Sequence, residues 1–156
     1  MKKVICWLLL LITMVGIFFF SAQTAEESDA TSGGVAENVL SIFYPSFDTL
    51  PQQVKQQMIS GINSTIRTLA HFCTFALVGF FVFLALDNYQ IKYKILYSQL
   101  ISTGYAIFDE IHQYFVPGRS MQFFDVLVDS FGAICGILFC LLVKNIIKKI
   151  KSRKTA

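Results

Sequence analysis

Charged residues are scarce in this chain. Asp, Glu, Lys and Arg make up only 15% of its 156 residues, whereas soluble domains average about 25%. Proline is also rare, with three residues, while 54% of the chain is hydrophobic. This composition excludes a disordered protein, a coiled coil and a nucleic-acid binder. With a mean hydropathy of +0.59, the chain is predicted to form one small membrane domain over residues 1–156.

A cysteine framework is lacking as well. The four cysteines show no CxxC or CxxH spacing, and each falls within an apolar segment: Cys6, Cys73, Cys135 and Cys140. Because buried apolar cysteines usually serve packing, we expect neither a disulfide nor a cysteine-ligated metal.

Four apolar segments approach the length of about 20 helical residues that a bilayer span requires. They lie at about residues 4–22, 68–87, 94–115 and 123–147. The third is the weakest, because several polar and charged residues interrupt it. The sequence therefore predicts an all-α integral membrane protein with four transmembrane helices. For the first segment, a cleaved signal peptide is an alternative interpretation.

The distribution of charge predicts the topology of these spans. Basic residues gather at the N-terminus, at Lys92 and Lys94, and in the tail from 144 to 154, whereas acidic residues gather between the first two spans. Cytoplasmic loops are enriched in Lys and Arg. We therefore predict that both termini are cytoplasmic and that a loop of about 23–66 lies outside. A basic tail beside a span more often anchors it to anionic lipid than binds nucleic acid.

Two parts of the predicted outer loop differ in composition. Residues 24–34 are small, polar and acidic, so we expect them to stay flexible. In residues 51–66, apolar side chains recur every four positions, which indicates a helix. This helix either lies in the outer membrane interface or packs on the spans.

Ionisable residues inside the third and fourth apolar segments mark the candidate site. Each costs a few kcal/mol in a membrane, so the default explanation for them is function. Helical spacing places Asp109 on one face with His112 and Gln113. Asp125 and Asp129 are four residues apart on the fourth segment and form a second polar stripe.

Two glycines continue the stripe of the fourth segment. Gly132 and Gly136 form a Gly-x-x-x-Gly pattern, which allows another helix to come close. The stripe is therefore predicted to face protein rather than lipid.

Three segments place ionisable groups at a similar depth. Asp109 lies about six residues from the outer end of its span, roughly 9 Å at helical rise, and Asp129 lies a similar distance into the fourth. Arg67 and His71, four residues apart, are near the outer end of the second. Arg119 follows a tight proline–glycine turn and can fold down over this level.

The carboxylates of this region outnumber its bases, which favours bound protons, a divalent cation or a cationic ligand. Mg²⁺ or Ca²⁺ bridging to a phosphate would suit them, with Arg119 holding the phosphate. Candidate catalytic residues are Asp109, Glu110, His112, Asp125 and Asp129. Candidate ligand-binding residues are Arg67, His71, Gln113 and Arg119. Candidate metal ligands are Asp109, Asp125 and Asp129. A buried ion-pair network that only fixes helix packing is the structural alternative.

The run AIFDEIHQYFVPGRSMQFFDVLVDSFGAICG closely resembles the signature of VanZ-like membrane proteins. That signature reads Asp-Glu-x-His-Gln, then Pro-Gly-Arg, then two Asp four apart, then Gly-x-x-x-Gly. The FSAQ sequence at residues 20–23, the following Ser28, and Arg67 with His71 and Phe72 match as well. The resemblance covers nearly the whole chain.

The resemblance implies a multi-pass protein of the bacterial plasma or inner membrane. The topology predicted from the charges places the motif on the extracytoplasmic side. The family's namesake is linked to resistance to the lipoglycopeptide teicoplanin, and no reaction is settled for the family. The implied partners are membrane lipid and a lipid-linked envelope precursor or a lipoglycopeptide, and a homo-oligomer is left open. Three hypotheses follow: an envelope protein that lowers susceptibility to such drugs, a membrane enzyme acting on a lipid-linked phosphate, and a structural scaffold.

Overall fold

The computed structural model describes residues 2–89 and 91–154, without the side chains of Lys2 and Lys154. Four residues of the predicted domain lie outside this part: Met1, Gln90, Thr155 and Ala156. The described residues form helices and contain no strand, so the predicted all-α class is confirmed. In chain order the elements are α1 (Lys2–Ser21), α2 (Ala25–Phe43), the short 3₁₀ helix η1 (Phe47–Thr49), α3 (Gln52–Asp87), α4 (Lys94–Tyr114) and α5 (Phe123–Lys154).

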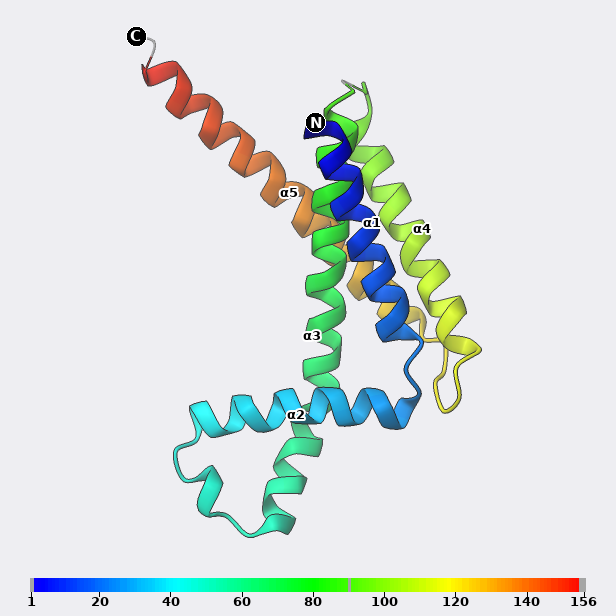
Figure 1. Ribbon diagram of the computed structural model, residues 1–156, viewed down its shortest axis with the longest axis vertical. Helices are drawn as coiled ribbons and strands as arrows, with labels where there is room; N and C mark the ends of the chain where they lie inside the picture. Colours follow the sequence, from blue (N-terminus) through cyan, green and yellow to red (C-terminus); the bar gives the residue numbers. More distant parts are fainter. Residues whose placement is uncertain (1, 90, 155–156) are drawn as a thin grey trace.

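Helix α3 lies at the centre of the bundle. It packs against α1, α2, α4 and α5. Figure 1 shows α1 and α4 running beside α3 along the long axis of the molecule, with α5 crossing it obliquely. Helix α2 instead runs across α3. Both termini and the α3–α4 turn lie at one end, here called the terminal end, while α2 and the α4–α5 loop lie at the other, the α2 end (Figure 1).

The hydrophobic core follows one face of α3. Phe75, Val78 and Val82 are fully buried, and their spacing of three and four residues places them on the same side of the helix. They form one cluster with Leu10 and Ile17 of α1. This packing holds α1 and α3 together and sets the frame in which the polar residues meet.

Helices α3 and α5 approach closely at the Gly-x-x-x-Gly motif. A Cβ atom on Gly132 would clash with the backbone carbonyl of Phe72, and one on Gly136 would clash with that of Ala76. Gly79 of α3 meets the α5 backbone in the same way. The prediction that this stripe faces protein is therefore confirmed, because only a missing side chain permits such contact.

Within the described residues, three helices are long and apolar enough to cross a membrane, over Lys3–Ser21, Gln52–Asp87 and Phe123–Arg153. Helix α4 has 21 residues, a sufficient length, but it is not among these three. Its polar residues, such as Gln99 and Asp109, lower its hydropathy.

The outer surface of the bundle is unusually apolar. Ile12 and Phe19 of α1 are 66% and 67% exposed, and many large apolar side chains of α4 and α5 are exposed as well. Extended exposed apolar surface marks contact with a membrane or another protein. Together with the span lengths, this surface fits a membrane protein.

The prediction that residues 24–34 are flexible is wrong, because this segment forms the first part of α2. Thr24 and Glu27 form a capping box: the Thr24 hydroxyl accepts from the Glu27 amide, and the Glu27 carboxylate accepts from the Thr24 amide. The small residues Ser28, Ser32 and Ala36 are buried, and their spacing of four places them on one face of α2. Local capping and close packing on α3 outweigh the polar composition.

The helix predicted over residues 51–66 is present, but it is not a separate interfacial element. It is the first part of α3, which continues unbroken for 36 residues from Gln52 to Asp87. At helical rise this is roughly 54 Å, well beyond the hydrocarbon thickness of about 30 Å. The helix that runs across the bundle is α2, and not the segment 51–66 (Figure 1).

Candidate functional site

Ionisable side chains from three helices meet at the α2 end of the bundle. His71 comes from α3, Asp109 from α4 and Asp129 from α5, and one ligand atom of each lies within 4.8 Å of the others. Asp109 is 1% exposed and Asp129 is fully buried. Residues that are 20 to 58 positions apart in sequence thus form one cluster, with both carboxylates buried and His71 partly exposed; it is here called the carboxylate cluster.

Hydrogen bonds from two helices fix the Asp109 carboxylate. The Ser21 hydroxyl at the end of α1 donates to Oδ2 of Asp109 over 2.9 Å, and the Gln113 side-chain amide donates to the same oxygen over 2.9 Å. The predicted pairing of Asp109 with Gln113 at one helical turn is therefore observed. These donors partly compensate the burial of the carboxylate.

Asp129 lacks such compensation. Neither of its oxygens has a hydrogen-bond partner in the described part of the chain, and the same is true of Nδ1 of His71. The two groups are 3.9 Å apart, measured from His71 Nδ1 to Asp129 Oδ2, which is too long for a hydrogen bond. Buried polar groups are nearly always paired, so these orphan atoms mark an exception that needs a ligand or a shared proton.

Arg119 covers this region from the α4–α5 loop. Gly118 has a φ of 77°, a left-handed conformation that glycine adopts without strain, and the chain turns there. The Arg119 guanidinium then donates from Nη1 to Oε1 of Gln113 over 2.7 Å and from Nε to the carbonyl oxygen of Gln23 over 3.0 Å. The loop is thereby fixed to both α4 and the segment after α1.

The charge of Arg119 is not matched by a carboxylate within salt-bridge distance among the described residues. Burial, and to a lesser degree the nearby positive charge of Arg67, lower the pKa of the Arg119 guanidinium below its ordinary value. An anion bound beside it would relieve this unfavourable environment.

The remaining candidate residues surround the carboxylate cluster without joining it. One Glu110 oxygen accepts from the backbone amide of Gln122 over 2.8 Å, so Glu110 anchors the α4–α5 loop. The His112 ring stacks on Phe18 of α1, with the ring centres 4.3 Å apart. Asp125 lines a polar cavity beside the cluster.

Two adjoining cavities lie next to the carboxylate cluster. The smaller, of about 80 Å³, is polar and is bordered by Gln113 and Asp125 as well as by Arg67, His71 and Arg119. The larger, of about 390 Å³, lies between α1, α2 and α3 and is mostly apolar, and Arg67, His71 and Arg119 border it too. The two cavities therefore share three basic side chains. The larger volume is within the range of small-molecule sites.

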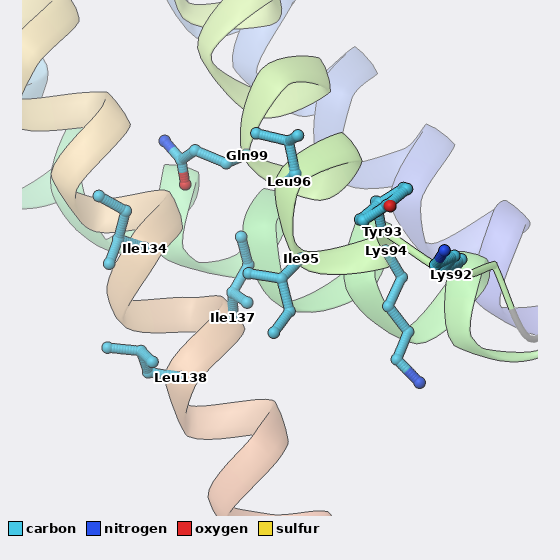
Figure 2. A pocket seen from close by; sticks show the side chains of 9 residues that line it. All are labelled: Lys92, Tyr93, Lys94, Ile95, Leu96, Gln99, Ile134, Ile137 and Leu138. Carbon is cyan, nitrogen blue, oxygen red and sulfur yellow. The ribbon is translucent and has the colours of Figure 1, made fainter.

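A third cavity lies at the terminal end, between α4 and α5. It has a volume of about 470 Å³, and Figure 2 shows the apolar side chains of Ile95, Ile134 and Leu138 along it, with Lys92 and Lys94 near its edge. None of the candidate site residues lines this cavity.

Several contacts of the site involve residues that the chemical argument from sequence did not assign. Ser21 and Gln23 contact the cluster and Arg119, and both lie in the FSAQ segment that matched the family signature. Asp29 of α2 pairs with Arg67, at 3.3 Å between Oδ1 and Nη1. No spacing rule connects these residues to their partners on α3, on α4 and in the α4–α5 loop, because the partners lie 38 to 96 positions away in sequence.

Comparison with known families agrees with the signature. Comparisons with curated proteins and with solved structures give no match. A model of the VanZ/LLP1 family matches residues 6–144, which include every candidate residue of the site. The resemblance to VanZ-like proteins is confirmed, and the chain belongs to the VanZ/LLP1 family.

Proposed function

We propose that this chain is a multi-pass protein of the bacterial plasma or inner membrane, with four spans, cytoplasmic termini and the carboxylate cluster on the extracytoplasmic side. The terminal end carries the basic N-terminal segment, the α3–α4 turn with its lysines, and the basic tail (Figure 1). The acidic α2 and the α4–α5 loop lie at the other end. This charge asymmetry supports the orientation.

We further propose that the α2 end binds an amphiphile with an anionic head and an apolar tail. The observation that carries this proposal is the pair of adjoining cavities, one polar and one mostly apolar, that share Arg67, His71 and Arg119. The head, a phosphate or carboxylate, would lie beside the two guanidinium groups, which suit oxyanions. The tail would occupy the larger cavity between α1, α2 and α3.

Binding can be tested with purified protein and hexadecyl phosphate, using hexadecanol as a ligand of equal tail length without the charge. We expect hexadecyl phosphate to bind and Arg119→Gln to weaken it at least tenfold. Lys92→Gln, at the edge of the separate cavity in Figure 2, is the matched control and should bind as wild type. Equal binding of the alcohol and the phosphate would contradict the proposed head site.

In the cell, this activity is proposed to lower susceptibility to lipid-tailed glycopeptides such as teicoplanin. Membership of the VanZ/LLP1 family supports this, and so does a cavity of a size that admits a lipid tail. A strain lacking the gene would be complemented with wild type, Asp109→Asn, Arg119→Lys or Asp129→Asn. We expect loss of protection against teicoplanin, but not against a tail-less glycopeptide, at unchanged protein level in the membrane.

An enzyme acting on a lipid-linked phosphate is the second candidate function. His71, which borders the polar cavity, and Asp129, 3.9 Å behind it, favour it, because an imidazole next to a bound phosphate and a carboxylate near that imidazole can transfer protons. The test is phosphate release from a lipid diphosphate in micelles. If wild type releases phosphate and a normally folded Asp129→Asn variant does not, the result supports an enzyme. If wild type releases no phosphate, this substrate class is excluded.

A further inference from the structure

The carboxylate cluster has the spacing of a metal site. Single atoms from His71, Asp109 and Asp129 lie within 4.8 Å of one another, and His71 Nδ1 is 3.9 Å from Asp129 Oδ2. Two ligands of one zinc ion, each at about 2.1 Å from it, are roughly 3 to 4 Å apart. The observed separations therefore need only small side-chain shifts to enclose an ion.

The charges of the cluster also favour a cation. Asp129 has no exposed surface, and its two oxygens lack a donor in the described part of the chain. His71 is the one base within ion-pair distance of Asp129 among the described residues. Taking a carboxylate out of water costs several kcal/mol unless a partner compensates it, and a divalent cation would compensate Asp109 and Asp129 together.

Asp109 is already oriented for such a role. Its Oδ2 accepts hydrogen bonds from Ser21 and Gln113, each of 2.9 Å. Hydrogen bonds of this kind hold a ligating carboxylate in place and are typical of the surroundings of metal sites.

The donor set indicates the class of ion. One imidazole nitrogen and two carboxylate oxygens suit Zn²⁺ or Mn²⁺, whereas Mg²⁺ and Ca²⁺ prefer oxygen alone. The His71 ligand distinguishes this set from the all-carboxylate set of Asp109, Asp125 and Asp129 that the sequence predicts. Three protein ligands leave one position open on a zinc ion, and His71 borders both cavities.

We propose that His71, Asp109 and Asp129, brought together from α3, α4 and α5, bind one divalent transition-metal ion such as Zn²⁺. The ion would link the three helices at the α2 end, and His71 connects the site to the polar cavity that it borders. This site does not depend on the proposed amphiphile, since its ligands all come from the chain itself.

The test uses the purified full-length chain in detergent, stripped with a chelator and dialysed against Zn²⁺ alone. We expect one zinc per chain by elemental analysis, with at least tenfold weaker binding in Asp129→Asn and in His71→Phe. Asp48→Asn, which removes an exposed carboxylate of η1, is the matched control and should bind as wild type. No zinc in wild type, or equal binding in Asp129→Asn, would overturn the proposal.

X-ray absorption of the zinc-loaded wild type keeps the proposal testable even if a variant fails to fold. The expected spectrum has nitrogen and oxygen ligands with the multiple scattering of one imidazole. Sulfur ligands would assign the ion to a cysteine and contradict the site. Because this measurement does not use hexadecyl phosphate, failure here is distinct from failure of hexadecyl phosphate to bind.

Discussion

The two ends of the helix bundle surround their carboxylates differently, one of which is partly exposed and the other fully buried. At the terminal end, Asp87 at the end of α3 accepts hydrogen bonds from Lys94 over 2.6 Å and from Lys144. At the α2 end, Asp129 is more deeply buried but has only His71 nearby, at 3.9 Å. One carboxylate thus has two bases in contact, and the other has an unpaired histidine.

This difference distinguishes two roles that charged residues can have in an apolar helix bundle: a structural ion pair and a ligand site. The Asp87 group joins α3, α4 and α5 through one carboxylate that accepts hydrogen bonds from two lysines, as expected of a structural ion pair. The carboxylate cluster joins the same three helices, yet leaves donors and acceptors unused. An unsatisfied group of this kind favours a site that a ligand completes, rather than one that only fixes packing.

We expect the largest effect from a substitution that disrupts the packing of α5 on α3 and thereby the structure at both ends of the bundle. Gly136→Leu places a side chain into the carbonyl of Ala76, and overpacking against backbone should cost about 3 kcal/mol or more. We expect the protein level in the membrane to fall at least tenfold. Gly104→Leu on α4 is the matched control, because a Cβ there meets no atom within 4 Å; an equal loss in both variants would contradict the packing argument.

At the terminal end, Asp87→Asn should destabilise the fold without affecting the α2 end. It leaves Lys94 and Lys144 without their carboxylate, and hydrogen bonds to charged groups contribute about 1.5–3 kcal/mol. We expect the midpoint of thermal unfolding to fall by several degrees, while the affinity for hexadecyl phosphate stays the same. A large loss of affinity would show that the two ends are not independent.

At the α2 end, Arg119→Lys should weaken anion binding more than Arg67→Lys. Arg119 is fixed by two hydrogen bonds that use different guanidinium nitrogens, and lysine cannot reproduce this fork. Arg67 is 36% exposed and makes a longer contact of 3.3 Å to Asp29. We expect roughly a tenfold loss of affinity, about 1.4 kcal/mol, for Arg119→Lys. An equal loss of affinity in the two variants would contradict the larger contribution of Arg119 to anion binding.

The smallest effect is a pH dependence at the start of α2. The hydrogen bond from the Thr24 backbone amide, followed by that from its hydroxyl, lowers the pKa of Glu27 below its ordinary value of 4.5. A carboxyl whose pKa falls on folding stabilises the folded state above pH 4.5, and this stabilisation disappears as the pH falls through the lower folded value.

Hydrogen-exchange protection factors of the first turn of α2 measure this dependence. In wild type they should fall as the pH is lowered from about 5 through the lowered pKa of Glu27. Glu27→Gln keeps a capping residue without a titrating charge, so its protection should not depend on pH in this range. Identical profiles in the two proteins would contradict the role of the Glu27 carboxylate.

The sequence predicts much of this site because ionisable residues in apolar segments have few explanations. The shared depth of His71, Asp109 and Asp129 follows from the helical rise and the ends of the spans. The packing of α5 on α3 follows from Gly132 and Gly136. These predictions use distances along single helices, which sequence determines well.

Other features depend on which helices become neighbours, and sequence spacing does not define that. His112 shares a face with Asp109 by spacing but stacks on Phe18, because α1 packs beside α4. Helix α2 is not predicted from its composition because it depends on the capping box of Thr24 and Glu27 and on packing against α3. The pairing of Asp87 with Lys144 joins residues 57 positions apart.

The thermal unfolding of Asp129→Asn, measured with a chelator present, tests most directly whether the carboxylate cluster is a ligand site. The substitution removes an uncompensated buried charge, so we expect a midpoint equal to or above that of wild type. Asp87→Asn, measured in parallel, should unfold at a lower temperature. A midpoint for Asp129→Asn that falls as far as that of Asp87→Asn would show that the cluster holds the helices together, and would contradict the account.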